Sequence, residues 1–115
     1  IKKIKLRAKE FEDKIAVKLS GYGLVNRLVK TKRGFADIIL ERNGKSAVIE
    51  IKDYEAKNIS MTDIKQLNKY LEDCKCNIGI LICYKKPKKD KFLIGENNIF
   101  LLEENELSKI PSIID

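Results

Sequence analysis

Three charged residues, set in runs that otherwise read as buried β-strands, could do chemistry together. Asp37 lies in the apolar run 35–42, Glu50 lies near the end of the run 45–52, and Lys52 follows two residues later. Carboxylates are among the side chains least often buried unless a partner compensates their charge. Hard cations such as Mg²⁺ take oxygen ligands, typically one or two carboxylates with waters and substrate phosphates. The two acids therefore predict a divalent-cation site.

The turn between the two runs predicts how the acids face each other. Asn43-Gly44 between β-rich segments is the strongest short-range hairpin signal, and pairing from this turn down the ladder places Asp37 opposite Glu50. Opposed side chains have Cβ atoms roughly 5 Å apart, where two unit charges repel by roughly 3 kcal/mol at an effective dielectric constant of about 20. Lys52 projects from the same face as Glu50 and would offset part of this repulsion. A divalent cation would offset it fully.

A second interpretation of the same residues is structural. Acid-x-Lys triplets occur often by chance in a chain with this many charges, and most of those present fall in predicted helices or loops. Glu50-Ile51-Lys52 differs because it ends an apolar strand and has an acid opposed across the hairpin. It could still belong to a salt-bridged, water-facing side of an antiparallel sheet. The pattern alone leaves both interpretations open.

The elements that would position these residues follow from periodicity. Residues 5–20 predict a first helix, with Phe11, Ile15 and Leu19 at helical spacing. Glu12 falls inside the apolar arc of this helix, so its carboxylate needs a partner. A strand at 22–30 and the hairpin strands at 35–42 and 45–52 follow.

The second half of the chain predicts one more helix and one central strand. Ser60 and Asp63 match a capping box, which starts a helix that runs to about residue 73 and carries Gln66 and Tyr70 one turn apart. The apolar run 77–84 is typical of a strand covered on both faces. A basic loop at 85–91, a final hairpin or edge strands at 91–94 and 99–102, and a helical turn at 103–109 complete the order. This order predicts a mixed α/β fold with helices on the faces of the sheet.

Composition limits the class of partner. The chain has 115 residues, of which 43% are hydrophobic, which suits a single domain over 1–115. Because the first residue is Ile1, we also expect that it could be a fragment of a longer chain. Lys and Arg outnumber Asp and Glu by 24 to 17, and this net charge of +7 favours a polyanion, either nucleic acid or an anionic membrane surface. No apolar run long enough to span a membrane and no signal-peptide pattern is present, so we expect a cytoplasmic protein without membrane partners.

The absence of one residue type excludes several chemistries. The chain contains no histidine, so a Ser-His-Asp or Cys-His nucleophile system and a Cys2His2 zinc site cannot be built from it. The three cysteines, Cys74, Cys76 and Cys83, are odd in number, and free thiols are expected in a reducing compartment.

Together these residues resemble the PD-(D/E)xK phosphodiesterase superfamily, which has a restriction-endonuclease-like αβββαβ core and includes restriction endonucleases, archaeal Holliday junction resolvases and RecB-like exonucleases. Asp37 matches the motif acid and Glu50-Ile51-Lys52 matches the (D/E)xK element, although Ala36 replaces the proline of the motif. Glu12 and its helix resemble the first helix of Mrr-like and resolvase-like members. Gln66 to Tyr70 matches the QxxxY signature of RecB-like members.

The resemblance implies an Mg²⁺- or Mn²⁺-dependent endonuclease that hydrolyses DNA phosphodiester bonds. Asp37, Glu50 and Glu12 would hold the metal, Lys52 would be catalytic, and the QxxxY pair Gln66 and Tyr70 would position the DNA strand. Further phosphate contacts are expected from Lys30, Lys32, Arg33 and the basic loop 85–91.

Several functional alternatives stay open at this point. Cutting both strands would require two sites, so a twofold homodimer is expected. A Holliday junction resolvase, a degenerate nuclease fold that binds DNA without turnover, and a nuclease acting on RNA are the alternatives.

Overall fold

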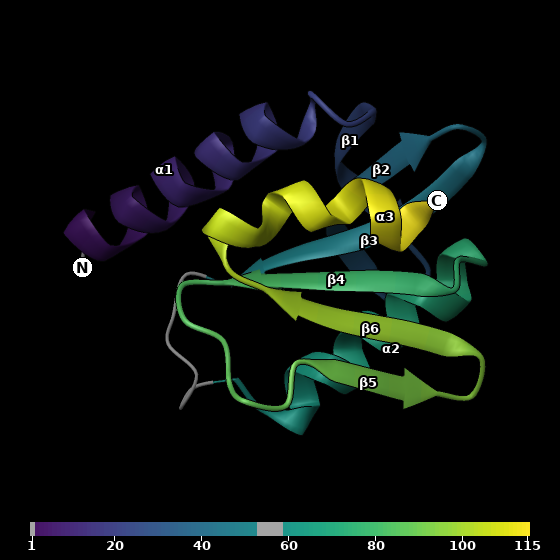
Figure 1. Cartoon of the computed structure of the whole chain (residues 1–115). Coiled ribbons are helices and arrows are strands. Elements are labelled where there is room, and N and C mark those ends of the chain that lie inside the picture. Colours follow the sequence, from purple (N-terminus) through teal and green to yellow (C-terminus); the bar gives the residue numbers. More distant parts are fainter. Residues whose placement is uncertain (1, 53–58) are drawn as a thin grey trace.

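The computed structural model describes the backbone of residues 2–52 and 59–115, and the side chains from residue 7 onward within these ranges. The elements, in chain order, are α1 (Lys2–Leu19), β1 (Leu24–Thr31), β2 (Gly34–Arg42), β3 (Lys45–Lys52), α2 (Met61–Cys74), β4 (Ile78–Cys83), β5 (Lys91–Ile94), β6 (Asn97–Leu102), the 3₁₀-helix η2 (Glu104–Lys109) and α3 (Ile110–Ile114) (Figure 1). The predicted helix, three strands, helix and strand are confirmed, and so are the two C-terminal strands. No helix among the described residues is both long and apolar enough to cross a membrane.

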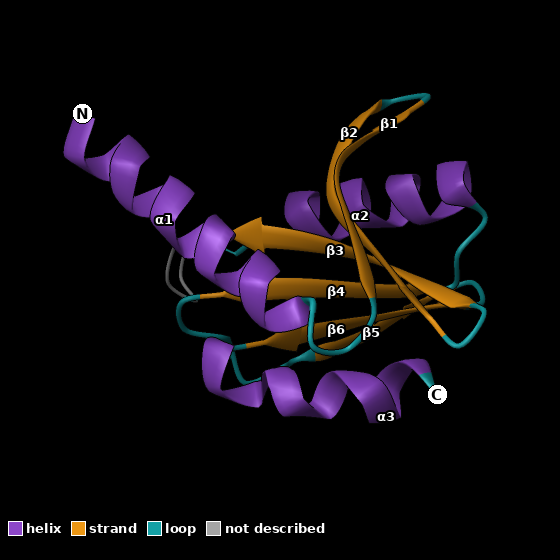
Figure 2. Ribbon diagram, turned by 90° about the horizontal axis from the view of Figure 1, so that it is seen from above, coloured by secondary structure: helices purple, strands orange, loops and turns teal. Residues whose placement is uncertain are grey.

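One mixed sheet of six strands organises the domain. Its order is β1-β2-β3-β4-β6-β5, with β4 parallel to both β3 and β6 and the remaining pairs antiparallel. Helix α2 covers one face, whereas α1 and the C-terminal helices η2 and α3 cover the other (Figure 2). Two apolar clusters fill these layers, one under α1 and α3 and one under α2. The fold is therefore the α/β arrangement, with a mixed sheet flanked by helices, that the element order predicts.

The turn and the cap that fix the local register form as predicted. Asn43 and Gly44 have φ values of 51° and 79°, as a two-residue turn of type I′ requires. From this turn, β2 and β3 pair in the predicted register as far as Ile38 and Ile49. At the start of α2, the capping box between Ser60 and Asp63 is present. The turn determines the register of the two strands that carry the acids, and the capping box determines where α2 begins.

The contact between β4 and α2 leaves little room for a side chain at Gly79. A Cβ atom added there would lie 3.1 Å from Leu67 Cγ and 3.1 Å from Leu71 Cδ1, and both leucines are fully buried. The bare backbone of Gly79 is what allows α2 to approach the central strand.

Gly79→Ala should therefore lower the free energy of unfolding by about 1–3 kcal/mol, because overpacking forces buried side chains out of their preferred rotamers. Urea denaturation of the variant and the wild type measures this. Gly21→Ala is the control, since an added Cβ meets only the Lys18 carbonyl oxygen at 3.4 Å. If Gly79→Ala were as stable as the control, α2 would not be in close contact with β4.

Candidate active site

The candidate site lies where the β2–β3 ladder ends. The last paired residues are Ile38 and Ile49. Beyond them the Asp37 backbone N–H donates to Glu50 Oε2 at 2.7 Å, and the Ile51 backbone N–H donates to Asp37 Oδ2 at 2.8 Å. Each carboxylate thus takes the place of a backbone carbonyl on the opposite strand. The structure brings the two predicted acids together through these reciprocal bonds.

The pairing of β2 with its other neighbour, β1, is also interrupted at Asp37. On either side, Arg27 pairs with Ile38 and Val29 pairs with Ala36, whereas Leu28 between them has a φ of 50°. A non-glycine residue with positive φ carries conformational strain, which typically costs about 1–3 kcal/mol and occurs often at functional sites. The distortion at Leu28 means that Asp37 lies beside an irregularity on both of its neighbouring strands.

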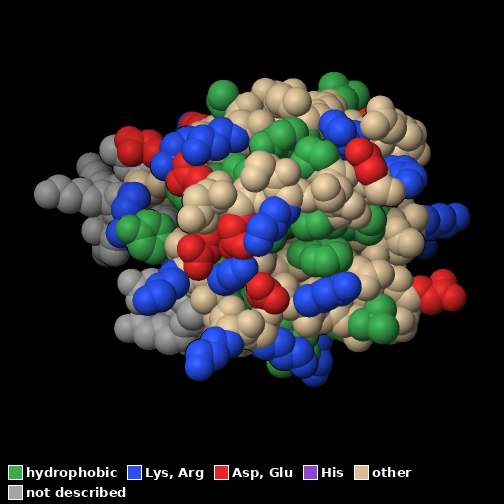
Figure 3. Space-filling model, in the orientation of Figure 1, with side chains coloured by type: hydrophobic (Ala, Val, Ile, Leu, Met, Phe, Trp, Pro, Cys, Tyr) green, Lys and Arg blue, Asp and Glu red, His purple; other side chains and the backbone are tan. Residues whose placement is uncertain are grey.

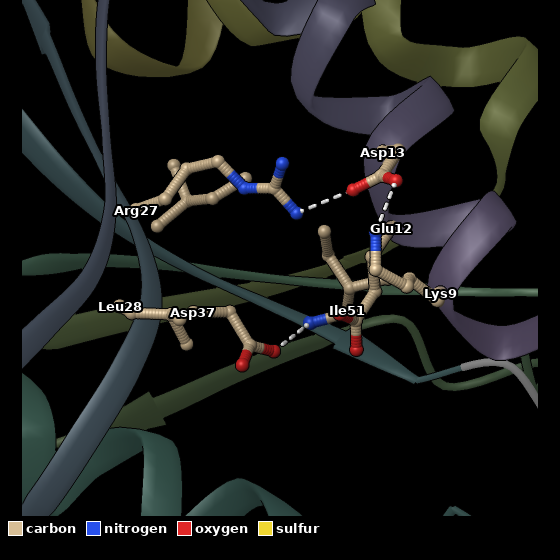
Figure 4. Close-up of a pocket in the computed structure, with 8 residues that line it drawn as sticks. Lys9, Glu12, Asp13, Arg27, Leu28, Asp37 and Ile51 are labelled. Carbon is tan, nitrogen blue, oxygen red and sulfur yellow. Dashed lines mark hydrogen bonds and ion pairs between the residues drawn. The ribbon is translucent and has the colours of Figure 1, made fainter. Parts of the chain in front are cut away.

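A cavity of about 380 Å³ opens at this irregularity (Figure 4). It is lined by Lys9, Glu12 and Asp13 from α1 and by Arg27, Leu28, Asp37, Ile38 and Ile51 from the sheet. Side chains of consecutive residues normally point to opposite faces of a strand. Here two pairs of consecutive residues, one on β1 and one on β2, line the same cavity. The local distortion thus concentrates polar side chains between α1 and the sheet.

Burial raises the pKa values of all three predicted acids, and repulsion from Asp37 adds to the shifts of Glu50 and Glu12. Glu50 is 7% exposed and is the one buried charged residue among those described; burial first, and Asp37 second, raise its pKa to about 7. Burial also raises the pKa of Asp37, although the Ile51 N–H and Lys52 oppose this shift. The pKa of Glu12 rises through burial and then through repulsion from Asp37. The site therefore favours bound protons or another source of positive charge.

Lys52 is held between the acids and the start of α2. Its Nζ lies 4.0 Å from Asp63 Oδ1, while Asp63 Oδ2 accepts the backbone N–H of Ser60 in the capping box. The positive charge of Lys52 lowers the pKa values of Asp37 and Glu50. This partial compensation is what the alternation of β3 predicts.

The carboxylate oxygens of Asp37 and Glu50 are suitable ligands for a hard divalent cation. Asp37 and Glu50 each use one oxygen to accept a backbone N–H, so the second oxygen of each carboxylate could serve as a ligand. Two carboxylates with waters and substrate phosphates are a typical Mg²⁺ environment. Among the described residues, however, no three Asp, Glu, Cys or His side chains gather closely enough to hold one ion. Glu12 shares the cavity with Asp37, but the predicted three-carboxylate ligand set is not assembled.

The residues predicted to contact the substrate occupy different environments. Lys30 and Lys32 are exposed near the β1–β2 turn. Arg33, in contrast, donates from Nε and Nη2 to Asp73 Oδ1 at 3.0 and 2.8 Å and from Nη2 to the Lys69 carbonyl at 3.0 Å. This pairing anchors the turn to α2 and already neutralises Arg33.

The two residues of the predicted QxxxY signature lie on α2. Gln66 is half-buried, and Tyr70 is 8% exposed within the apolar cluster under this helix. A Cβ atom at Gly34 would lie 2.8 Å from the Tyr70 hydroxyl. Tyr70 therefore packs against the base of the β1–β2 hairpin, and neither residue lines the cavity.

The lysines of the basic loop 85–91 also differ in their environments. Lys86 binds Asp90 at 2.9 Å and Glu106 at 2.8 Å, so it joins the loop to η2. The remaining lysines of the loop are exposed: Lys85, Lys88, Lys89 and Lys91. On the face covered by α3, basic and acidic side chains are interspersed (Figure 3).

Three polar residues of the cavity, Lys9, Asp13 and Arg27, were not found by sequence reasoning. Asp13 accepts a hydrogen bond from Arg27 Nη2 at 2.9 Å and one from Lys9 Nζ at 3.1 Å (Figure 4). Asp13 is on the solvent side of the apolar arc of α1, so its spacing suggested only a solvated charge. No pattern in the sequence signals the ion pair with Arg27 across the cavity.

The raised pKa of Glu50 predicts how the metal-free protein responds to pH. A carboxyl group whose pKa is higher in the folded state than its ordinary value of 4.5 binds protons more tightly when folded. Its contribution to stability is therefore complete below pH 4.5 and is lost as the pH rises through about 7. The shifts of Asp37 and Glu12 act in the same direction.

In chelator, Glu50→Gln should therefore resemble the wild type near pH 4.5 and exceed it at pH 8 by up to about 3 kcal/mol. Denaturation at a series of pH values measures the difference. Glu10→Gln removes an exposed acid of α1 and should follow the wild type. Parallel loss of stability in the Glu50→Gln variant and the wild type would contradict the buried, repelled state of Glu50.

Comparison with known proteins places these observations in a family. No curated protein and no solved structure gives a significant match to the chain. The sequence model of the Mrr catalytic-domain family, described as a restriction endonuclease, matches residues 4–110. This range includes Asp37, Glu50 and Lys52, and the part of α1 that carries Glu12. The chain therefore belongs to the Mrr-type restriction endonuclease family of the PD-(D/E)xK nuclease superfamily.

Proposed function

We propose that the protein is a metal-dependent endonuclease that hydrolyses DNA phosphodiester bonds. The observation that carries this proposal is the reciprocal pair of Asp37 and Glu50 at the end of the β2–β3 ladder. If the two acids had only a structural role, we would expect their carboxylates to lie apart, or every carboxylate oxygen to accept a hydrogen bond. Here the pKa of Glu50 is raised to about 7, and the second oxygen of each carboxylate faces no backbone donor among the described residues. Family membership supports a nuclease-type activity.

Each polar group of the site has a role in this proposal. Asp37 and Glu50 would bind a divalent cation, which when bound polarises the phosphoryl oxygen and lowers the pKa of water. Lys52 would donate to the attacking water or to the charge that develops on the phosphate. Glu12, across the cavity from the strands, would orient a water molecule rather than bind the cation directly.

The surroundings of the cavity suit a nucleic-acid backbone. The net charge is +7, and exposed Lys30 and Lys32 lie on the hairpin that ends at the site. Phosphate neutralisation by such lysines is independent of sequence and weakens with salt. Cleavage of both strands would use a twofold dimer, which presents one site to each strand.

Cleavage of a supercoiled plasmid and of a four-way junction, each with Mg²⁺ and with chelator, tests the proposal. We expect the wild type to produce nicked or linear plasmid with Mg²⁺ but not with chelator. Asp37→Asn should not cleave, and the exposed control Glu10→Gln should cleave as the wild type does. Selective cutting of the junction would indicate a resolvase. DNA binding without cleavage in any condition would indicate a binding module, and cleavage in chelator would contradict the metal dependence.

Lys52→Ala should separate binding from catalysis. The variant should bind DNA nearly as tightly as the wild type, because one phosphate contact adds little to a polyelectrolyte interaction. Its cleavage rate should fall by about 10²–10³, which is typical for loss of a group that stabilises the transition state.

Single-turnover cleavage and fluorescence anisotropy on the same duplex measure these two quantities for Lys52→Ala. Lys65→Ala removes the same charge from an exposed position on α2 and should change neither quantity. An undiminished cleavage rate in Lys52→Ala would remove Lys52 from the catalytic site.

A further inference from the structure

The β1–β2 hairpin exposes large apolar side chains directly beside the candidate site. Leu28 is 69% exposed and Phe35 is 58% exposed, and the exposed Lys30 lies two residues from Leu28 on β1 and directly opposite Phe35 on β2. We call Leu28, Lys30 and Phe35 the hairpin strip. Single exposed apolar residues are common, but exposed apolar side chains that gather beside a polar cavity mark a candidate contact surface.

The three side chains of the hairpin strip lie on one face. Lys30 pairs directly with Phe35, so their side chains project to the same side of the two strands. Ala36, the next residue on β2, packs into the cluster under α2. Phe35 and Lys30 therefore project toward the side of α1, where Leu28 lines the cavity.

The hairpin strip is continuous with the candidate site. Leu28 and Asp37 line the same cavity, and Phe35 precedes Asp37 by two residues, about 7 Å along an extended strand. A nucleotide whose phosphate reaches Asp37 thus has its neighbouring base within reach of the Phe35 ring. Figure 2 shows that the β1–β2 hairpin bends out of the plane of β3 and β4, toward the side of α2.

We propose that the hairpin strip binds an unpaired nucleobase next to the scissile phosphate, and that the substrate is DNA with a single-stranded segment at the cut. This inference rests on the proposed nuclease function. Phe35 stacks on the base, Leu28 packs against its edge, and Lys30 neutralises the adjoining phosphate. Aromatic rings interleaved with lysines are the usual means of binding single strands. In a continuous duplex the faces of each base are covered by its neighbours, so Phe35 has no base to stack on.

The lysine of the hairpin strip, Lys30, favours DNA over a second copy of this chain. A contact between identical strips would bring Lys30 of each copy into the interface, where like charges repel. Lys32 is exposed at the adjoining turn and adds to this positive charge. A polyanion with apolar bases satisfies both features of the hairpin strip.

The test measures affinity in chelator, so that turnover plays no part. Fluorescence anisotropy would compare a labelled single-stranded oligonucleotide with the same sequence as a blunt duplex. Phe35→Ala should weaken single-strand binding by about 5- to 100-fold, the range typical of a lost base stack, and change duplex binding less than twofold. Phe35→Trp should retain single-strand affinity, because it keeps an aromatic face. Leu93→Ala, on β5 at the opposite edge of the sheet, removes a side chain that is 68% exposed and should change neither affinity.

The outcomes distinguish this inference from the proposed function. Equal effects of Phe35→Ala on both DNAs, or no effect, would overturn the stacking role even if the wild type binds and cleaves DNA. Failure of the wild type to bind either DNA would overturn the nuclease proposal as well. If gel filtration showed that Phe35→Ala turns a dimer into a monomer without selective loss of single-strand affinity, the hairpin strip would be a contact between copies.

Discussion

The backbone groups that the β2–β3 ladder leaves unpaired at its end are the constraint on which the site depends. Buried N–H groups must find an acceptor, and past Ile38 the carbonyls of the opposite strand no longer supply one. Asp37 and Glu50 supply it with their carboxylates. Because side chains complete the pairing, β2 can leave β3 and continue with β1 into the bent hairpin. The hydrogen bonds that end the β2–β3 pairing thus also place the two acids side by side where the strands separate.

This arrangement costs stability when no cation is bound. Burial raises the pKa values of both carboxylates, and repulsion from Asp37 raises that of Glu50 further. Leu28 adds a positive φ next to them. Lys52 offsets part of the charge, and its approach to Asp63 links it to the capping box of α2. Strain and repulsion of this kind are typical of functional sites, where the folded structure holds groups in positions that they would not adopt alone.

The sequence predicts most of the fold because its strongest signals are local. The Asn43-Gly44 turn determines the hairpin register, and Ser60 with Asp63 determines where α2 begins; both need only neighbouring residues. The positive φ of Leu28 could not be predicted, because a branched apolar residue carries no turn signal and the conformation follows from the interrupted pairing on both sides of Asp37. The ion pair of Arg33 with Asp73 joins residues 40 positions apart, and it gives Arg33 a structural partner where the sequence suggested a DNA contact. Glu12 reaches the correct cavity, but its position relative to the other acids depends on how α1 crosses the sheet.

The most direct test of the central claim is anomalous diffraction from crystals of the protein soaked in Mn²⁺, recorded near the manganese absorption edge. The account predicts one strong peak within coordination distance of the Asp37 and Glu50 carboxylates, absent from crystals of Asp37→Asn. A fully occupied peak elsewhere on the molecule, or no peak beside these acids at millimolar Mn²⁺, would contradict it.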